Sequence, residues 1–281
     1  MAEATRVTLT IAGSDPSGGA GIQADLKTFH QFGVYGQAVI TLITVQNTLG
    51  VQRVQGLEAD LVSAQIRAVV EDMPPQAVKT GALGDEAIVE VVASLVEEFH
   101  LRVVVDPVMI GKHGTPLLSE RACQVLRARL LPLCDLLTPN LNEAAALTGL
   151  EVKTPHHMKQ AATKLCEMGA RSVLIKGGHL AGDPLDILLH EGRWHEYSGA
   201  RIETRHTHGT GCTYSAAITA CLAKGQSLPE AVQAAKNYIQ EAIRTNPGLG
   251  RGTGPLNHHA TPGYNSGYNS GDNSGRNSGD N

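Results

Sequence analysis

The stretch RVVVDPVM, residues 102–109, decides the fold class. It is a run of valines that ends at Asp106, and such a continuous apolar run is typical of a strand covered on both faces. RSVLIKGG, residues 171–178, repeats the pattern and ends near Lys176. Strands buried on both faces belong to parallel sheets flanked by helices, so these two stretches predict an α/β fold.

Strand-like and helix-like segments alternate on both sides of this stretch. The alternation predicts a three-layer αβα sandwich with a mostly parallel central sheet. The expected strands cover residues 7–13, 37–48, 76–81, 102–109, 134–140 and 171–178, and the expected helices cover 21–33, 61–73, 86–100, 119–130, 156–169, 212–224 and 228–245. Ligands of such sheets bind beyond the carboxyl ends of the strands, where Asp106, Asn140 and Lys176 stand.

Composition limits the class of protein. The chain has 281 residues, of which 42% are hydrophobic, enough for a sizeable core. The net charge of −4 without a basic block argues against nucleic-acid binding. The sequence shows no secretory signal and no apolar run that could span a bilayer. Five cysteines without a CxxC pair argue against a zinc site or a disulfide framework. We therefore expect a cytoplasmic protein with reduced thiols.

The C-terminal end differs from the rest of the chain. GYNSGYNSGDNSGRNSGDN, from Gly263 onwards, repeats a polar four-residue unit with almost nothing to bury. We expect one domain over residues 1–260 and a low-complexity, disordered tail over residues 261–281.

The first of two glycine-rich loops is GSDPSGGAG, residues 13–21. It follows an expected strand and precedes an expected helix. It lacks the GK[ST] of a Walker loop and the GxGxxG spacing of a Rossmann fingerprint. By itself it is either a tight turn or a ligand loop, and Asp15 and Asp25 are either caps and solvated charges or groups that face a ligand.

The second loop is THGTGCT, residues 207–213, which opens an alanine-rich segment. Its glycines allow close backbone approach, and the N–H groups of Gly209, Thr210, Gly211 and Cys212 predict an anion hole at the helix start. Cys212 is either a small buried residue or a reactive thiol. A helix N-terminus lowers the pKa of a thiol, so we expect a thiolate near neutral pH that acts as a base and not as a covalent nucleophile.

Residues suited to phosphoryl transfer surround these loops. Lys176 can neutralise a phosphate. Asn140 and Glu143 stand three apart at an expected helix start and can hold Mg²⁺ directly or through water, with Asp106 as a further ligand. The alternatives are a capping box for Asn140 and Glu143 and a solvated strand end for Lys176.

Long motifs in the right order identify a family. The motifs span about residues 7 to 259 and are TIAGSDPSGGAGIQADLKTF, YGQAVITLITVQNT, AVKTG, VVVDPVM, LLTPNLNEA, VLIKGGH, THGTGCTYSAA and GTGPLNHH. The chain resembles the ribokinase-like superfamily and, within it, the bacterial hydroxymethylpyrimidine/phosphomethylpyrimidine kinases of thiamine biosynthesis. The resemblance implies ATP, Mg²⁺, commonly a homodimer, and two successive phosphorylations, of the pyrimidine alcohol and then of its monophosphate.

The resemblance also implies roles for single residues. Gln46 would bind the pyrimidine, and a carboxamide does match the donor and acceptor edge of an aminopyrimidine. The residues around the substrate would be Gly13, Ala20, Asp25 and Val108. Nucleotide and metal would be served by Asp106, Asn140, Glu143, Lys176, Thr207, Gly209, Thr210 and Gly211, with Asp106 and Glu143 on the metal. The catalytic set would be Cys212, Gly209, Gly211 and Lys176. Ala82 departs from the methionine of many relatives, which leaves the substrate range open.

Other functions remain in competition. A pyridoxal or pyridoxine kinase of the same superfamily is the nearest alternative, as a sole or side activity. A non-catalytic nucleotide or vitamin sensor is disfavoured by Asp106, Glu143, Lys176 and Cys212. A Rossmann dehydrogenase is disfavoured by the missing glycine fingerprint.

Overall fold

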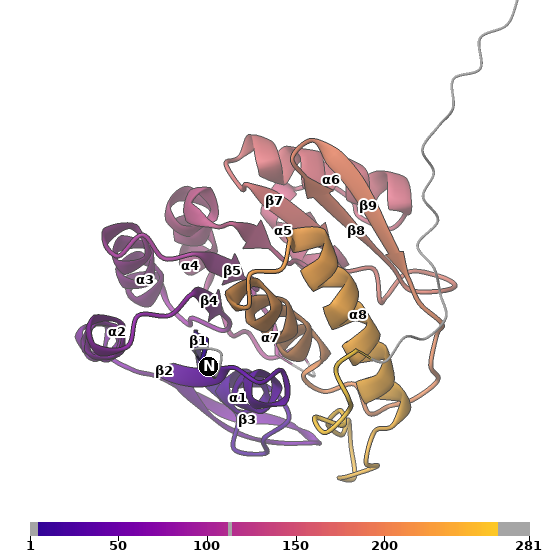
Figure 1. Cartoon of the computed structure of the whole chain (residues 1–281), viewed down its shortest axis with the longest axis horizontal. Helices are drawn as coiled ribbons and strands as arrows, with labels where there is room; N and C mark the ends of the chain where they lie inside the picture. Colours follow the sequence, from indigo (N-terminus) through magenta and orange to yellow (C-terminus); the bar gives the residue numbers. More distant parts are fainter. Residues whose placement is uncertain (1–4, 112–113, 264–281) are drawn as a thin grey trace, which may run out of the picture.

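A single mixed sheet organises the chain in the computed structural model, which describes residues 5–111 and 114–263. Its strand order is β3-β2-β1-β4-β5-β6-β7-β8-β9 (Figure 1). The strands are β1 (Val7–Ser14), β2 (Tyr35–Asn47), β3 (Gly50–Gly56), β4 (Ala77–Thr80), β5 (Val103–Val105), β6 (Leu136–Leu137), β7 (Ser172–Ile175), β8 (Leu185–His190) and β9 (Arg193–Ser198). From β2 to β7 the neighbouring strands pair in parallel. The predicted mostly parallel sheet is confirmed.

Both edges of the sheet are antiparallel, which the sequence reading did not predict. β3 pairs antiparallel with β2, and β8 pairs antiparallel with β7 and with β9. β8 and β9 are joined by Glu191 and Gly192, both with positive φ (49° and 73°). A two-residue turn with two positive φ values is the tight hairpin turn, so the glycine of the pair EG, directly after the apolar stretch DILLH, was the signal available in the sequence.

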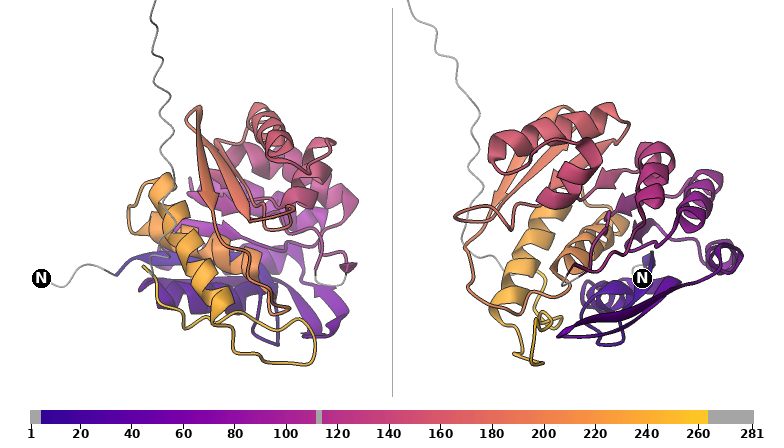
Figure 2. Two further views of the ribbon diagram at one scale, coloured as in Figure 1. Left: turned by 90° about the vertical axis from the view of Figure 1, so that its right-hand side faces the viewer. Right: turned by 180° about the vertical axis from the view of Figure 1, so that it is seen from behind.

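Helices cover both faces of the sheet (Figures 1 and 2). One face carries α2 (Ala59–Asp72), α3 (Glu86–Glu98), α4 (Glu120–Val125), α5 (Leu141–Thr148) and α6 (Pro155–Glu167). The other carries α1 (Gly21–Gln31), α7 (Thr210–Ala223) and α8 (Leu228–Arg244). The expected helix at 119–130 is divided, because α4 passes into a π-helical turn over Leu126–Leu130 and a 3-10 turn over Leu131–Leu133. The three-layer sandwich is confirmed.

The valines of β5 explain why that stretch is apolar without alternation. Val103 and Val105 belong to the core under α2 to α6, and Val104 belongs to the core under α7 and α8. All three side chains are fully buried. Each face of the strand therefore supplies one of the two cores, as the pattern of a covered parallel strand requires.

The carboxyl ends of the parallel strands form one rim of the sheet. Asp106 follows β5, Thr138 follows β6 and Lys176 follows β7. α7 begins at the same rim, and its residues from Thr213 to Ala223 are buried between the sheet and its neighbouring helices. The described part of the chain holds no helix with the length and apolarity needed to cross a bilayer.

Candidate active site

A cavity of about 720 Å³ opens at this rim between the two glycine-rich loops and the ends of the strands. Its wall contains nearly every residue predicted to form a site. These are Gly13, Ala20, Gln46, Asp106, Val108, Asn140, Glu143, Lys176, Thr207, Gly209, Thr210, Gly211 and Cys212. Asp25 is the exception. Segments that lie far apart in the sequence thus meet at one cavity.

Asp25 lies beneath the cavity and not on its wall. Its carboxylate is fully buried and pairs with the Lys79 ammonium at 2.8 Å. Thr10 Oγ1 donates a second hydrogen bond to it at 2.6 Å. Lys79, the ion-pair partner of Asp25, does line the cavity. The implied place of Asp25 beside the substrate stays a prediction, and Lys79 is a cavity residue that the sequence reading missed. A lysine inside a fully buried strand was its signal, since lysine is almost never fully buried without a partner.

The two glycine-rich loops are fastened to each other. Asp15 accepts hydrogen bonds from the backbone N–H groups of Gly19 at 3.1 Å and Ala20 at 2.9 Å. Nε2 of His208 lies 2.9 Å from the same carboxylate oxygen. Burial tends to raise the pKa of Asp15, but the hydrogen bonds from His208 and Ser17 lower it overall. Asp15 is therefore a buried carboxylate that joins the two glycine-rich loops through hydrogen bonds, and not a solvated charge.

Gly209 shows why the second loop needs glycine. Its φ is 82°, a left-handed conformation that favours glycine. A Cβ atom there would also lie 1.8 Å from the carbonyl oxygen of Gly19. The close approach of the two loops therefore requires glycine at position 209, whether or not a ligand also approaches this residue.

The start of α7 faces the charged part of the cavity. Its N-cap is Gly209, which has no side chain to cap the first turn, and the Thr210 N–H donates to the Thr207 carbonyl at 3.3 Å. Gly211 and Cys212, the next two residues of the first turn, line the cavity. A Cβ atom on Gly211 would lie 3.2 Å from Lys176 Nζ and 3.7 Å from Asp106 Oδ2. A small residue at this point leaves the helix start open to an anion that Lys176 also reaches.

Lys176 forms the centre of a charged group. Its Nζ donates to Asp106 Oδ1 at 2.7 Å, and both side chains are largely buried. Burial tends to lower the pKa of Lys176, but Asp106 and Glu143 raise it overall. The alternative of a solvated strand end does not fit these contacts.

Asn140 and Glu143 form a capping box that also lines the cavity. Glu143 Oε2 accepts from the Asn140 backbone N–H at 2.7 Å, and Asn140 Oδ1 accepts from the Glu143 N–H at 2.9 Å. Burial raises the pKa of Glu143 to about 7, with a further rise from Asp106 and a fall from Lys176. The capping reading is confirmed, and it leaves both side chains at the site. No group of three or more His, Cys, Asp or Glu side chains suited to a metal occurs within residues 5–111 and 114–263.

Cys212 differs from its expected state. Burial raises the pKa of its thiol to about 11, opposed by Lys79 and by a backbone hydrogen bond from Gly21. Asp25 and Asp106 raise it further. The prediction of a thiolate near neutral pH is wrong, because desolvation and two nearby carboxylates outweigh the helix start. All five cysteines are free thiols, as expected.

The two ends of the cavity have different chemistry. At the β2 end, Gln46 Nε2 donates to Thr44 Oγ1 at 2.7 Å, which orients the carboxamide. At the α8 end, Lys236 Nζ donates to Asp186 Oδ2 at 2.6 Å. The apolar side chains of Ile202, Ile239 and Ile243 line the same end. Sequence reading missed Asp186 and Lys236, which lie in strand β8 and helix α8, where no motif stood out.

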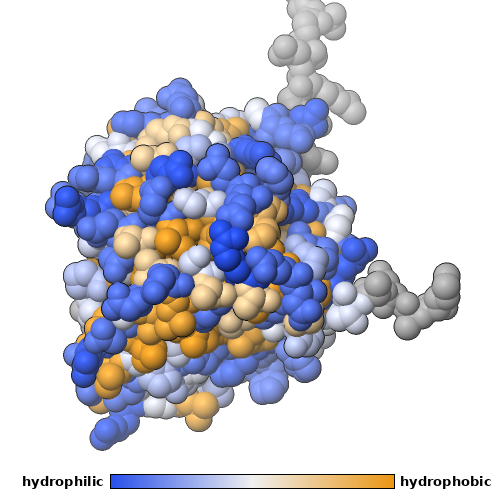
Figure 3. All heavy atoms as spheres, turned by 90° about the vertical axis from the view of Figure 1, so that its left-hand side faces the viewer, coloured by the Kyte–Doolittle hydropathy of each residue, from blue (hydrophilic) through white to orange (hydrophobic). Residues whose placement is uncertain are grey.

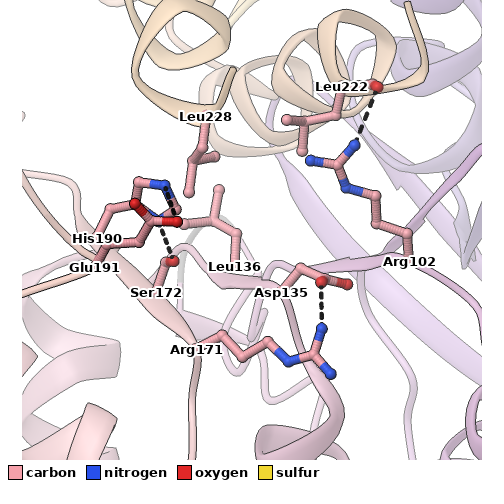
Figure 4. A pocket seen from close by; sticks show the side chains of 9 residues that line it. All are labelled: Arg102, Asp135, Leu136, Arg171, Ser172, His190, Glu191, Leu222 and Leu228. Carbon is pink, nitrogen blue, oxygen red and sulfur yellow. Dashed lines mark hydrogen bonds and ion pairs between the residues drawn. The ribbon is translucent and has the colours of Figure 1, made fainter. Parts of the chain in front are cut away.

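A second cavity, of about 270 Å³, lies at the opposite rim of the sheet (Figure 4). Its charged groups already pair with protein atoms. Arg171 donates to Asp135 at 2.9 Å, and Arg102 donates to the Leu222 carbonyl at 3.3 Å. We therefore place the site at the rim that holds Lys176 and the start of α7.

Known proteins resemble the chain over almost its whole length. The family model described as phosphomethylpyrimidine kinase matches residues 15–257. The hydroxymethylpyrimidine/phosphomethylpyrimidine kinase of Streptomyces coelicolor is 48% identical over 252 residues, which cover 90% of this chain and 94% of that protein. A crystal structure of phosphomethylpyrimidine kinase from Clostridium difficile 630 superposes with a TM-score of 0.77 at 44% identity, covering 85% of this chain and 100% of that one. The ADP complex of Bacillus subtilis pyridoxal kinase superposes with a TM-score of 0.84 at 40% identity, covering 92% and 98%. The chain therefore belongs to the phosphomethylpyrimidine kinase family, on a ribokinase-like fold.

Proposed function

We propose that the chain phosphorylates 4-amino-5-hydroxymethyl-2-methylpyrimidine with ATP and then phosphorylates the monophosphate to the diphosphate, as a step of thiamine biosynthesis. The observation that carries the proposal is one cavity that joins Gln46 at its β2 end to Lys176 and the start of α7. A carboxamide pairs with the donor and acceptor edge of an aminopyrimidine. A lysine and a helix start provide the positive field that phosphoryl transfer needs.

Each group then has a role. Gln46 orients the pyrimidine, with Gly13, Ala20 and Val108 around the ring. The N–H groups at Gly209 to Cys212, together with Lys176, stabilise the charge on the transferred phosphoryl group. Cys212 takes the proton of the hydroxymethyl group in the first step. Thr207 and Asn140 contact the nucleotide, whose base lies against the isoleucines near α8.

ATP is bound with Mg²⁺ in this proposal, and the residues present fit a magnesium ion. Mg²⁺ is held by one or two carboxylates together with substrate phosphates. Asp106 and Glu143 supply two buried carboxylates, and the raised pKa of Glu143 indicates a place where a cation would be favourable. The ion would neutralise charge on the phosphates, while Lys176 and the start of α7 position them.

The test is a kinase assay with purified protein, Mg²⁺ and ATP, in which the pyrimidine monophosphate and diphosphate are detected by mass. The proposal expects both products in sequence. Absence of both, with intact folded protein, would refute it.

A second candidate activity is phosphorylation of pyridoxal. It is supported by the likeness to the pyridoxal kinase of Bacillus subtilis and by Ala82, which lines the cavity where many relatives of the pyrimidine kinases carry methionine. Turnover of pyridoxal and of the pyrimidine alcohol, measured side by side, decides between a single and a dual activity.

We also infer a cytoplasmic homodimer that binds neither nucleic acid nor membranes. Figure 3 shows apolar side chains gathered on one face of the molecule. Ile43 and Val45 on β2 are 47% and 50% exposed, and Leu61 on α2 is 49% exposed. Contiguous apolar surface of this kind marks interaction sites, and a second copy of the chain is the occupant that the family resemblance implies. Light scattering on the wild type and on Ile43→Asp tests this, since a monomeric wild type would refute it.

The domain organisation belongs to the same proposal. Residues 1–260 would form the one kinase domain and residues 261–281 a passive tail. Of that tail, residues 264–281 lie outside the described residues. Deleting residues 264–281 should leave turnover unchanged.

A further inference from the structure

Asp186 on β8 links a helix to the turn that carries Lys176. Its Oδ2 accepts from the Lys236 ammonium of α8 at 2.6 Å. Its Oδ1 accepts from the backbone N–H of Gly177 at 2.8 Å. The Asp186 and Lys236 side chains are 4% and 6% exposed, so the pair is almost completely removed from water.

The Gly177 N–H is one peptide unit away from Lys176. The turn is also fixed on its other side, because the Lys176 N–H donates to the Pro139 carbonyl at 2.8 Å. A Cβ atom on Gly177 would lie 1.9 Å from the Leu185 carbonyl oxygen. The turn therefore packs against the start of β8. The hydrogen bond to Asp186 fixes the backbone position of Gly177, the residue that follows Lys176.

We propose that Asp186 is a positioning residue for Lys176, and that Lys236 is the counterion that keeps its carboxylate in place. The proposal rests on the proposed kinase function, in which Lys176 acts on the transferred phosphoryl group. Lys176 Nζ pairs with Asp106 and Asp186 pairs with Lys236, so Asp186 acts on Lys176 through the backbone of Gly177. Its own charge is matched by Lys236, because a buried carboxylate without a partner would be costly.

The main test is single-turnover phosphorylation by Asp186→Ala. Catalytic groups displaced by about 1 Å lose rate by up to about 100-fold. We expect the rate of the chemical step to fall about 10- to 100-fold, with the KM of the pyrimidine alcohol changed less than about threefold. In a Lys176→Met background the same Asp186→Ala change should alter the rate less than about threefold, because the group that it positions is gone. Equal losses in the two backgrounds would overturn the proposal.

The neutral pair Asp186→Asn with Lys236→Gln separates positioning from charge. An asparagine at 186 keeps an acceptor for the Gly177 N–H, and a glutamine at 236 removes the unpaired ammonium. We expect this double variant to recover most of the rate that Asp186→Ala loses. Should Asp186→Ala fail to fold, this pair decides: a folded double variant with the full loss of rate overturns the proposal.

Asp135 offers a matched control at the opposite rim of the sheet (Figure 4). It also joins a backbone N–H, that of Val103 at 2.9 Å, to a cation, that of Arg171 at 2.9 Å. Asp135→Asn should lower the melting temperature and leave the single-turnover rate unchanged. If the wild type forms no phosphorylated product, the proposed function fails. If the wild type is active and Asp186→Ala behaves like Asp135→Asn, only the positioning role fails.

Discussion

The pKa of Cys212 gives the sharpest prediction about the two phosphorylation steps. With a pKa of about 11, the thiol is almost entirely protonated at neutral pH. The thiolate fraction at pH 7 is then about 1 in 10⁴, and it rises about tenfold for each pH unit up to the pKa. If the thiolate takes the proton of the hydroxymethyl group, kcat/KM for the pyrimidine alcohol must rise with nearly the same slope between pH 7 and 9, because kcat/KM reports the free enzyme.

The second step should behave differently. Its nucleophile is a phosphate monoester with a second pKa of about 6, already ionised at neutral pH without help from a base. Its kcat/KM should therefore be nearly flat from pH 7 to 9. For the same reason Cys212→Ala should slow the first step about 100-fold or more, within the usual contribution of a general base, and slow the second step far less.

The assay is single turnover with each substrate across this pH range, in the wild type and in Cys212→Ala. Cys221→Ala is the matched control. Cys221 lies in the same helix and burial also raises its pKa to about 11, but it does not line the cavity. Equal losses for both substrates in Cys212→Ala, or a first step that reaches its plateau below pH 8, would refute the role of Cys212 as the base of the first step.

Three further predictions concern the walls of the cavity. Gln46→Leu should raise the KM of the pyrimidine alcohol about tenfold or more, since each buried group left unpaired costs about 1–3 kcal/mol, while the KM of ATP stays the same in steady-state assays. Because Glu143 has a pKa of about 7, it loses its proton as pH rises from 6 to 8, so the KM of Mg²⁺-ATP should fall over that range and Glu143→Gln should remove the dependence. Lys79→Met leaves the Asp25 carboxylate buried without a cation, with only the Thr10 hydroxyl as a donor, which should cost about 3–5 kcal/mol in denaturant unfolding, and Lys79→Met with Asp25→Leu should regain much of it.

The sequence predicted the parallel part of the sheet because each of those strands carries its own signal. Val103 to Val105 are apolar without alternation since both faces of β5 are covered. Chain direction then places the strand ends at one rim, so Asp106, Asn140 and Lys176 could be grouped before any coordinates. The edge strands β3 and β9 expose much of their length, and exposed strands need no apolar pattern. That is why both edges were missed while the centre was predicted.

The electrostatics of the site could not be read in the same way, because they depend on which charges meet after folding. Asp15 and His208 are 193 positions apart, and their contact fixes the loop in which Cys212 stands. Local sequence placed Cys212 at a helix start, where a thiol ionises readily. Folding added burial and two carboxylates around the same thiol, and these reverse the direction of the pKa shift. A base with a high pKa accepts a proton strongly but is rarely ionised at neutral pH, and general-base catalysis is most efficient when the pKa lies near the operating pH. The buried ammonium of Lys79 opposes the rise of the Cys212 pKa and therefore increases the fraction of thiolate. In the sequence Lys79 was only a lysine in an expected strand, so its effect on Cys212 could not be predicted.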